Sequence, residues 1–566
     1  MNILRINTRT RTYTREPVPE NWERLGGRGL VARILVDEVE ATCDPLGPKN
    51  KLIFAPGLLV GHMLSSCDRI SVGGKSPLTG GVKEANAGGR TGLALAHLGV
   101  KALILEDRPE DNEWQVIVLS AAGVRFEPAG DLVGLGVYAA AAELLARYGK
   151  EVAIALIGPG GEMGLSAAGV QNVDRDGVPS RIAARGGLGA LMGSKRVKAI
   201  VIDPSGGQKP PIAHPEAFRA AQKAFNKALQ EHPQTHTYHD YGTAAMTNMC
   251  NHFGGLPTRN FSAGSFEGAE QISGEHLRET ILARGGEGET SHACMRGCMI
   301  QCSNVFPDPD GKARVSPIEY ETIGLMGSNL GIDDLDAVAR LNQAVNDLGL
   351  DSIEIGAALG VAAEAGLMDF GDGARALELV DEIRRGTPLG RILGHGAATT
   401  GKVLGVERIP AVKGQAISAY DPRAIKGTGV TYATSPQGAD HTSGLTIRAK
   451  VDHTDPKGQA ELSRSAQINM AGYDTLGACL FAGFGFAAAP ETIRDLLNAR
   501  YGWDVGADIL QALGRESLKL EREFNRRAGF TPAHDRLPEW MTREPLPPTG
   551  AVFDVPEEDL DSVFNW

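Results

Sequence analysis

The sequence is poor in cysteine, in long apolar runs and in positive charge. Its 7 cysteines, an odd number spread over 566 residues, are poor material for a disulfide scaffold. The longest apolar stretch, residues 480–490, is too short to span a bilayer. The net charge of -12 argues against a general binder of nucleic acid or anionic membranes. Residues 1–20 have no apolar segment after their arginines and predict no secretory signal. We therefore expect a cytoplasmic protein with reduced thiols available to a metal.

The chain changes character after a proline- and glycine-rich stretch at residues 203–212. Before it, short β-branched runs bounded by turn residues predict strands at 51–59, 101–107, 114–120, 151–158 and 197–203, with a helix at 137–149. After it, apolar residues recur with helical periodicity at 215–232, 334–350, 353–367, 373–386 and 507–529. A second boundary is expected near 400–415. The sequence thus predicts an α+β fold, with a β-rich domain at 1–205 and two mostly α-helical domains at 212–405 and 406–566.

Three of the cysteines lie in the string CMRGCMIQC, as Cys294, Cys298 and Cys302. Residues four apart drift by only about 40° around a helix, so the three thiols share one face if the segment is helical, whereas Gly297 equally allows a loop. They are either small buried hydrophobes, zinc ligands with unusual spacing, or three ligands of a cubane iron–sulfur cluster with a remote fourth. The spacing does not choose among the remote candidates, which are Cys43, Cys67, Cys250 and Cys479.

Several glycine-rich strings occur at 73–81, 84–92, 157–164 and 184–195, and none matches a P-loop or a dinucleotide fingerprint. Together with Arg69, Arg90, Arg181 and Arg185 they favour an anionic ligand held by backbone N–H groups and guanidinium groups. The string EYET pairs Glu319 with Glu321, and GADHTSG places His441 between glycines. Such an acidic pair is usually a solvated face, and a histidine in a loop is usually structural.

Ordered strings along almost the whole chain carry a family resemblance. They are GGRGL (26–30), NKLIFAPGLL (50–59), KSPLTGGVKEANAGGRTG (75–92), IGPGGE (157–162), ARGGLGALMGSKRVKAIVID (184–203), the cysteine string, IEYETIGLMGSNLGI (318–332), NDLGLDS (346–352), TSPQGADH (434–441) and YDTLGACLF (473–481). In this order they resemble the tungsten-containing aldehyde ferredoxin oxidoreductase family. The resemblance implies a tungsten held by two pterin cofactors, a [4Fe-4S] cluster and a Mg²⁺ ion bridging the pterin phosphates.

The resemblance also assigns the cluster ligands. The family pattern D-x-x-G-L-C carries the fourth cysteine, and here it reads DTLGAC, which selects Cys479. The family spacing C-x2-C-x3-C becomes C-x3-C-x3-C in this chain. One extra residue can alter the exposure and potential of the cluster without losing a ligand.

Residues in matching positions are implied to bind the pterins. Around the phosphates and Mg²⁺ these are Arg69, Asn86, Gly88, Arg181, Ile182, Ala184 and Arg185. The second group is Asn346, Leu350, Asp351, Asp474 and Ala478. Asn346 stands where the family has an aspartate and offers only a neutral carbonyl to the pterin. We expect the carboxylate of the adjacent Asp347 to compensate for this missing charged contact.

The implied activity is oxidation of an aldehyde to a carboxylic acid, with electrons leaving through the cluster to a ferredoxin or an iron–sulfur subunit. Glu321 or Glu319 is the expected base, Glu321 being favoured because it adjoins the helical stretch that begins at Thr322. His441 is expected to donate a hydrogen bond to the metal-bound oxygen or the aldehyde carbonyl. The sequence leaves open tungsten versus molybdenum, the particular aldehyde, and a homodimer versus a larger complex.

Two alternative functions remain at this point. One is a low-potential aryl thioester (aromatic CoA) reductase subunit of the same family, and the other is an iron–sulfur electron-transfer subunit without pterin. Some family members also carry a mononuclear iron held by E-x-x-H motifs. The only such string here, ETSH at 289–292, immediately precedes the cysteines, so that iron is not predicted.

Overall fold

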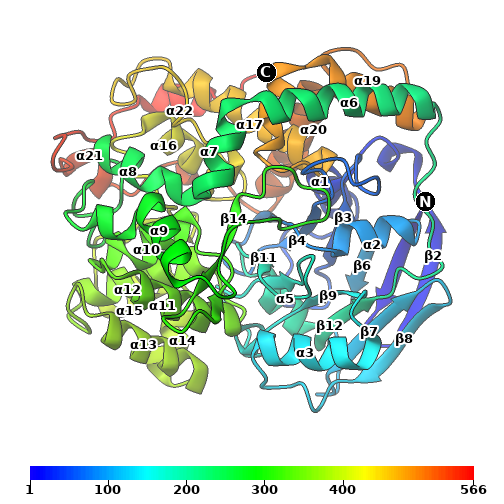
Figure 1. Cartoon of the computed structure of the whole chain (residues 1–566), viewed down its shortest axis with the longest axis horizontal. Helices are drawn as coiled ribbons and strands as arrows, with labels where there is room; N and C mark the ends of the chain where they lie inside the picture. The colour runs from blue at the N-terminus through cyan, green and yellow to red at the C-terminus, as the bar shows by residue number, and fades with distance from the viewer.

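Two six-stranded mixed sheets form the N-terminal part of the computed structural model, which describes residues 1–566 (Figure 1). The first sheet has the order β2-β1-β6-β3-β4-β5 and the second β11-β10-β9-β12-β7-β8. Their bounds are β1 Asn2–Asn7, β2 Thr12–Pro17, β3 Leu52–Pro56, β4 Ile70–Lys75, β5 Val82–Ala87, β6 Val100–Glu106, β7 Gln115–Ser120, β8 Gly123–Pro128, β9 Ala153–Leu156, β10 Val170–Asn172, β11 Arg181–Ala183 and β12 Val197–Ile202. Only the pairs β1–β6 and β7–β12 are parallel.

The sequence of strand β6 is an almost continuous apolar run because the strand is buried on both faces. Leu103 and Leu105 belong to a core cluster of 26 residues shared by the two sheets, whereas Ala102 and Ile104 belong to the main core on the opposite face. Because successive side chains of a strand point to opposite faces, a strand buried on both sides must be apolar throughout. The two sheets therefore share one core, to which the helical segments 91–97 and 188–194, each in contact with both sheets, also contribute.

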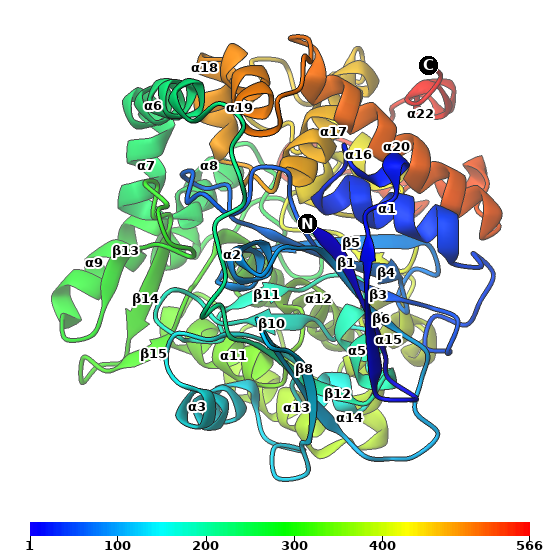
Figure 2. The same cartoon turned by 90° about the vertical axis from the view of Figure 1, so that its right-hand side faces the viewer.

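The helices of this part are α1 Gly27–Glu38, α2 Thr91–His97, α3 Val137–Tyr148, α4 Pro159–Glu162 and α5 Leu188–Ser194. Helix α1 packs on β3 and β4, while α3 buries Ala140 and Leu144 against the far face of the second sheet. In Figure 2 the two helices lie at opposite sides of the paired sheets.

The rest of the chain is mostly helical. Its helices are α6 Pro215–Glu231, α7 Pro233–Tyr241, α8 Met246–His252, α9 Gly274–Arg284, α10 Tyr320–Met326, α11 Leu335–Asp347, α12 Ser352–Glu364, α13 Gly373–Arg385, α14 Pro388–Gly394, α15 Ala397–Leu404, α16 Lys426–Thr434, α17 Gln459–Leu476, α18 Ala482–Ala488, α19 Glu491–Tyr501, α20 Ile509–Arg527, α21 Trp540–Arg543 and α22 Glu557–Ser562. Short strands add β13 Glu289–His292, β14 Ser303–Pro307, β15 Ala313–Val315, β16 Ala411–Val412 and β17 Gln415–Ala416. None of the helices is both long and apolar enough to cross a membrane.

Side-chain caps fix the helix starts in this region. Asp334 accepts the N–H of Asp336 at the start of α11, and Asp351 accepts that of Ile353 at the start of α12. Such caps satisfy N–H groups that have no partner within the helix. Helix α13 ends at Gly386, which takes the left-handed conformation with φ 64°. Glycine adopts this conformation without strain.

The C-terminal helices return to the first sheet. Helices α17 and α20 pack on each other and on α1 (Figure 1). Arg28 of α1, 1% exposed, donates to both carboxylate oxygens of Glu521 at 2.7 and 2.9 Å and lies 3.3 Å from Asp474 Oδ2. This buried ion-pair network joins the two ends of the chain.

The predicted α+β architecture, with a β-rich N-terminal part and a helical remainder, is confirmed, and the strands and helices expected from the sequence all form. The cysteine segment is a loop between β13 and β14 rather than a helix. Gly297 lies within it at φ 78°, a conformation that would strain most other residues.

Candidate active site

A cavity of about 350 Å³ lies where β11, the cysteine loop, α10 and the segment around His441 meet. Many of the predicted site residues line it: Arg69, Gly88, Arg181, Ile182, Ala184, Cys294, Cys302, Glu319, Glu321, Asn346, Asp351, His441 and Cys479. They come from distant parts of the chain and converge on one space. This cavity is therefore the candidate active site.

The antiparallel pairing of β13 with β14 closes the loop that carries Cys294, Cys298 and Cys302. Contacts with two N-terminal segments hold the loop in place. The N–H of Gly89 donates to the carbonyl of Cys294 at 3.0 Å, and the N–H of Met299 donates to Ser65 Oγ at 3.0 Å. The loop is thus fixed at both ends before any metal is considered.

Ser66 links the loop to Cys479. Its hydroxyl lies 3.3 Å from Cys298 Sγ, and its carbonyl accepts the N–H of Cys479 at 2.7 Å. Helix α17 ends just before Cys479, with Gly477 as a left-handed cap at φ 78°. Ser66 therefore contacts both the cysteine loop and Cys479, which is remote from that loop in the sequence.

The thiols of Cys294, Cys302 and Cys479 lie in an environment that disfavours free thiolates. Burial raises the pKa of Cys302 and Cys479, and burial together with the neighbouring Cys298 raises the pKa of Cys294 to about 12. Thiolates in such a place need the positive charge of a metal centre.

The other remote candidates lie outside the cavity lining. Cys43 lies near Lys75, and Cys250 is buried in α8 beside Tyr320. Cys67 is fully buried near Cys298 and Cys479 but does not line the cavity either. Among the four remote candidates, Cys479 alone faces this space.

Two buried nitrogen atoms of Arg181 have no hydrogen-bond acceptor in the protein. Its Nη1 donates to Ser303 Oγ at 2.8 Å, whereas its buried Nε and Nη2 form no hydrogen bond, and Nη2 lies 3.9 Å from Asp174 Oδ2. Asn86 Nδ2 is likewise buried without a partner, while Asn86 accepts from Arg69 through both its side chain and its carbonyl. Buried donors normally have partners, so these atoms fit an anionic group bound in the cavity.

At Gly88 the backbone passes so close to the cysteine loop that a larger side chain would meet Cys294. A Cβ atom at this position would lie 3.0 Å from Cys294 Sγ, closer than normal van der Waals contact. The glycine string at 84–92 therefore brings backbone against the cysteine loop, next to the arginines.

Arg185 occupies a different place from Arg69 and Arg181. Its guanidinium donates to Ser418 Oγ at 3.0 Å, to the carbonyl of Ala439 at 2.5 Å and to Asp351 Oδ2 at 3.2 Å. It does not line the cavity, and its donors are used within the protein. Here it supports the segment that carries His441.

The second group of predicted pterin ligands divides in two. Asn346 and Asp351 line the cavity, whereas Leu350, Asp474 and Ala478 do not. The expectation that Asp347 compensates for Asn346 is wrong. Its carboxylate points away, accepting from the N–H of Tyr138 in the first turn of α3 and from Arg384 at 3.0 Å.

Glu319 and Glu321 both line the cavity but differ in partners. Glu319 precedes α10, and its carboxylate accepts from the hydroxyl of Thr243. Glu321 Oε2 accepts the N–H of Ala419 at 2.7 Å, and its Oε1 forms no hydrogen bond and lies 3.4 Å from His441 Nε2. Burial raises the pKa of both carboxyl groups. Only Glu321 is adjacent to the histidine.

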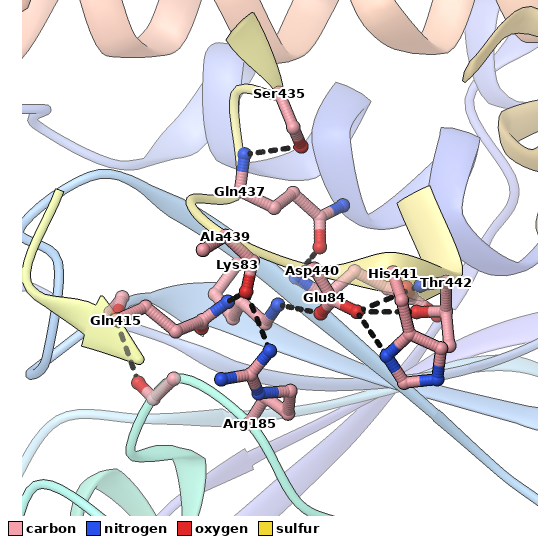
Figure 3. Close-up of polar contacts among 12 residues, drawn as sticks. Lys83, Glu84, Arg185, Gln415, Ser435, Gln437, Ala439, Asp440, His441 and Thr442 are labelled. Carbon is pink, nitrogen blue, oxygen red and sulfur yellow. Dashed lines mark hydrogen bonds and ion pairs between the residues drawn. The ribbon is translucent and has the colours of Figure 1, made fainter. Parts of the chain in front are cut away.

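His441 is held from behind by a buried charge pair (Figure 3). Lys83, which is fully buried, donates to Asp440 Oδ2 at 2.8 Å, and Asp440 Oδ1 accepts the N–H of Thr442 at 3.0 Å. Burial alone would raise the pKa of Asp440, but the charges of Lys83 and Arg185 lower it far below its usual range. Asp440 is therefore a permanent anion that orders the turn containing His441.

Sequence reasoning missed Lys83 and the aromatic side of the cavity. Tyr238, Tyr320, Tyr420, Phe481 and Arg448 all line it. Their spacing in the chain carries no periodic signal. For Lys83 the one available hint was its position inside the string that also contains Asn86 and Gly88.

Two family models match the chain. The N-terminal domain of aldehyde ferredoxin oxidoreductase matches residues 3–204, and domains 2 and 3 match residues 220–565. The chain is 33% identical to a tungsten-containing aldehyde ferredoxin oxidoreductase of Thermococcus kodakarensis, over 96% of this chain and 92% of the relative. Identity to the protein of the same name from Pyrococcus furiosus is 32% with the same coverage.

More distant similarities extend to other named functions. The chain is 26% identical to the WOR-like subunit of an aliphatic sulfonate oxidoreductase of Pyrococcus furiosus, over 88% of this chain and 81% of that subunit. Among solved structures, the active site complex BamBC of benzoyl coenzyme A reductase superposes with a TM-score of 0.80 at 18% identity, covering 100% of this chain and 93% of that chain. At this identity the likeness shows a shared fold.

Proposed function

The chain belongs to the aldehyde ferredoxin oxidoreductase family, and from this premise we propose that it is an enzyme that oxidises aldehydes to carboxylic acids. The proposal rests on one observation above all. The Glu321–His441 pair opens onto the same cavity as the unpaired donors of Arg181 and the thiols of Cys294, Cys302 and Cys479. Acid–base groups, an anion-binding group and soft metal ligands thus share one space.

The residues present fit the family's cofactors. Arg69, Arg181 and Asn86 Nδ2 would bind the pterin phosphates, and the carbonyl of Ile182 would be a ligand for Mg²⁺. Cys294, Cys298, Cys302 and Cys479 would hold a [4Fe-4S] cluster. When bound, the tungsten–pterin group supplies the two-electron chemistry and the cluster the single-electron transfer to the acceptor. We propose tungsten rather than molybdenum because tungsten appears in the names of the similar enzymes.

The chain's own residues would handle the protons. An aldehyde and one water give the acid, two protons and two electrons, so a base must accept a proton from water. Glu321 Oε1 is the proposed base, because it lines the cavity and forms no hydrogen bond within the protein. Glu319 is already engaged by Thr243, and we assign it a supporting role.

His441 would bind the carbonyl oxygen of the aldehyde. Ser418 Oγ accepts from Arg185 and lies 3.0 Å from His441 Nδ1. The hydroxyl proton of Ser418 is therefore free to donate to Nδ1, which favours the tautomer with the ring proton on Nε2. A hydrogen bond from Nε2 would stabilise negative charge developing on the aldehyde oxygen.

The electron acceptor is proposed to be a ferredoxin, which the names of the relatives indicate for those enzymes, or an iron–sulfur subunit. We propose a cytoplasmic location, since the cluster ligands must stay reduced until they bind iron. A homodimer or a larger complex is the proposed assembly.

Metal analysis and activity together test this function. The purified holoenzyme should contain about one tungsten and about four iron atoms per chain, and should reduce a viologen dye with aldehydes. An aryl thioester assayed in the opposite direction at low potential tests the reductase alternative. Tungsten absent from an iron-containing protein would favour the alternative of an iron–sulfur subunit without pterin. Activity with the thioester alone would favour the reductase.

A further inference from the structure

An arginine at the aromatic side of the cavity has no role in the chemistry described so far. Arg448 lines the cavity together with Tyr238 and Phe481. Its guanidinium carbon lies 5.0 Å from the ring centroid of Tyr238 and 5.5 Å from those of Phe481 and Phe484. The rings of Tyr238 and Phe481 stack on each other, with centroids 4.4 Å apart. The charged group is thus held in place by aromatic rings.

The charge of Arg448 has no counter-ion in the protein. Its one hydrogen bond goes from Nη2 to the hydroxyl of Tyr238, and no carboxylate forms an ion pair with it. The side chain is half-buried. A cation partly removed from water without an anionic partner loses solvation free energy, which a bound anion would restore.

Arg448 and the proposed catalytic pair face the same cavity. The ring of Tyr420, also in the lining, lies 5.9 Å from that of His441 and 5.1 Å from that of Tyr320, and the charge of Arg448 lowers the pKa of Tyr420 against the larger effect of burial. Aromatic side chains therefore extend from the histidine towards the arginine. A substrate whose aldehyde carbon meets Glu321 has an aromatic wall beside it.

We propose that Arg448 selects aromatic aldehydes that carry a carboxylate on the far side of the ring. This inference rests on the proposed aldehyde oxidation and adds the substrate class to it. A carboxylate matches one guanidinium fork through two parallel hydrogen bonds. Phosphate dianions are commonly bound by more than one cation, and the other cavity arginines, Arg69 and Arg181, are already assigned to the pterin phosphates.

A matched pair of substrates tests the proposal on the holoenzyme. 4-Formylbenzoate and 4-methylbenzaldehyde differ in charge but little in size, and each is assayed by dye reduction. The wild type should show a kcat/KM for the carboxylate at least about tenfold higher, a difference expected for a charge-assisted pair. Arg448→Met keeps the apolar stem of the side chain and should lose this preference, mainly through a higher KM for 4-formylbenzoate.

Control variants separate charge recognition from structural effects. Arg448→Lys keeps the charge and should retain part of the preference. Lys450→Met removes an exposed cation two residues away that does not line the cavity, and should leave both substrates unaffected. Binding of benzene-1,4-dicarboxylate, measured by calorimetry, gives a readout independent of turnover. It should weaken strongly in Arg448→Met, partly in Arg448→Lys and not at all in Lys450→Met.

The outcomes distinguish this inference from the proposed function. Equal kcat/KM values for the two aldehydes in the wild type, or an equal loss for both in Arg448→Met, would overturn the role of Arg448 while leaving aldehyde oxidation intact. A tungsten-loaded wild type that oxidises aliphatic aldehydes but neither of these compounds would also overturn the role of Arg448, whereas one that oxidises no aldehyde would overturn the proposed function itself. Should Arg448→Met fail to fold, the wild-type preference and the calorimetry on Arg448→Lys decide the question.

Discussion

His441 Nε2 lies 3.4 Å from Glu321 Oε1, across the candidate active site. The two residues reach this position from different elements, Glu321 from the first turn of α10 and His441 from the turn capped by Asp440. Neither residue alone would indicate catalysis, since buried carboxyl groups and loop histidines are common. Their juxtaposition beside unpaired arginine donors gives the pair a chemical meaning.

We predict that removing His441 slows turnover without removing the metal. His441→Asn should lower kcat by about 10²-fold, as loss of one donor to a developing oxyanion commonly does. Tungsten and iron contents should stay at the wild-type values, because the ring does not contact the cysteines or the unpaired arginine donors. The measurement is steady-state kinetics normalised to tungsten. An unchanged kcat would remove His441 from the mechanism.

The pH dependence should report the ionisation of Glu321. Burial raises its pKa, while the neighbouring His441 and the N–H of Ala419 act in the opposite direction. A base works only when ionised, so kcat/KM should fall as the pH drops through this raised value. In His441→Asn the lowering contribution of the histidine is lost, and the acid limb should move to higher pH. A limb that stays in place would show that another group controls it.

Cluster assembly should depend on Cys479 specifically. We expect Cys479→Ser to lose the visible absorbance of the cluster and most of its iron, because serine is a poor ligand in a site built for thiolates. Cys43→Ser is the matched control, since Cys43 lies near Lys75 and away from the cavity. Full iron content in Cys479→Ser would refute the proposed ligand set.

Local sequence patterns were sufficient for the strongly periodic helices, for the apolar strands of the N-terminal part and for the α+β architecture, because periodicity and turn residues act over short distances. Contacts between distant segments gave no such signal. The Asp347 carboxylate turned away from the cavity because the first turn of α3 and Arg384 offered it partners. Arg448 meets Tyr238 across 210 positions of sequence. Charged and aromatic residues of this kind acquire their roles only when the fold brings them together.

Arg181 should be required for the pterin but not for the cluster. Arg181→Met removes the two buried donors that have no partner in the protein, and we expect tungsten and pterin phosphate to fall while iron stays bound. Arg185→Met is the contrasting variant, because its guanidinium is bound by Ser418, Ala439 and Asp351. Arg185→Met should mainly lower the Tm, and the pterin phosphate content of the purified protein should stay closer to the wild-type value. If both variants lost the same amount of tungsten and kept the wild-type Tm, the assignment of Arg181 to the pterin and of Arg185 to stability would be contradicted.

The buried pair of Lys83 and Asp440 should be the clearest stability determinant near the site. Lys83→Met leaves the Asp440 carboxylate buried without its ion-pair partner, and removal of one partner of such a pair typically costs about 3–5 kcal/mol. The variant should therefore have a markedly lower Tm. Lys49→Met, which breaks an ion pair whose side chains are 67% and 54% exposed, is the surface control and should leave the Tm close to the wild-type value.

The sign of the pH effect follows from the depressed pKa of Asp440. A carboxyl group whose pKa is lowered on folding contributes stability above its unfolded pKa of about 3.9 and loses that contribution as the pH falls. In the wild type this contribution should persist through mildly acidic pH. In Lys83→Met burial dominates, so the variant should regain part of its relative stability as acid protonates Asp440. The double variant Lys83→Met/Asp440→Asn should recover stability at neutral pH, since asparagine retains the oxygen that caps Thr442 without the buried charge. Calorimetry across pH measures all three proteins, and a double variant no more stable than Lys83→Met would show that the pair acts through packing rather than through charge.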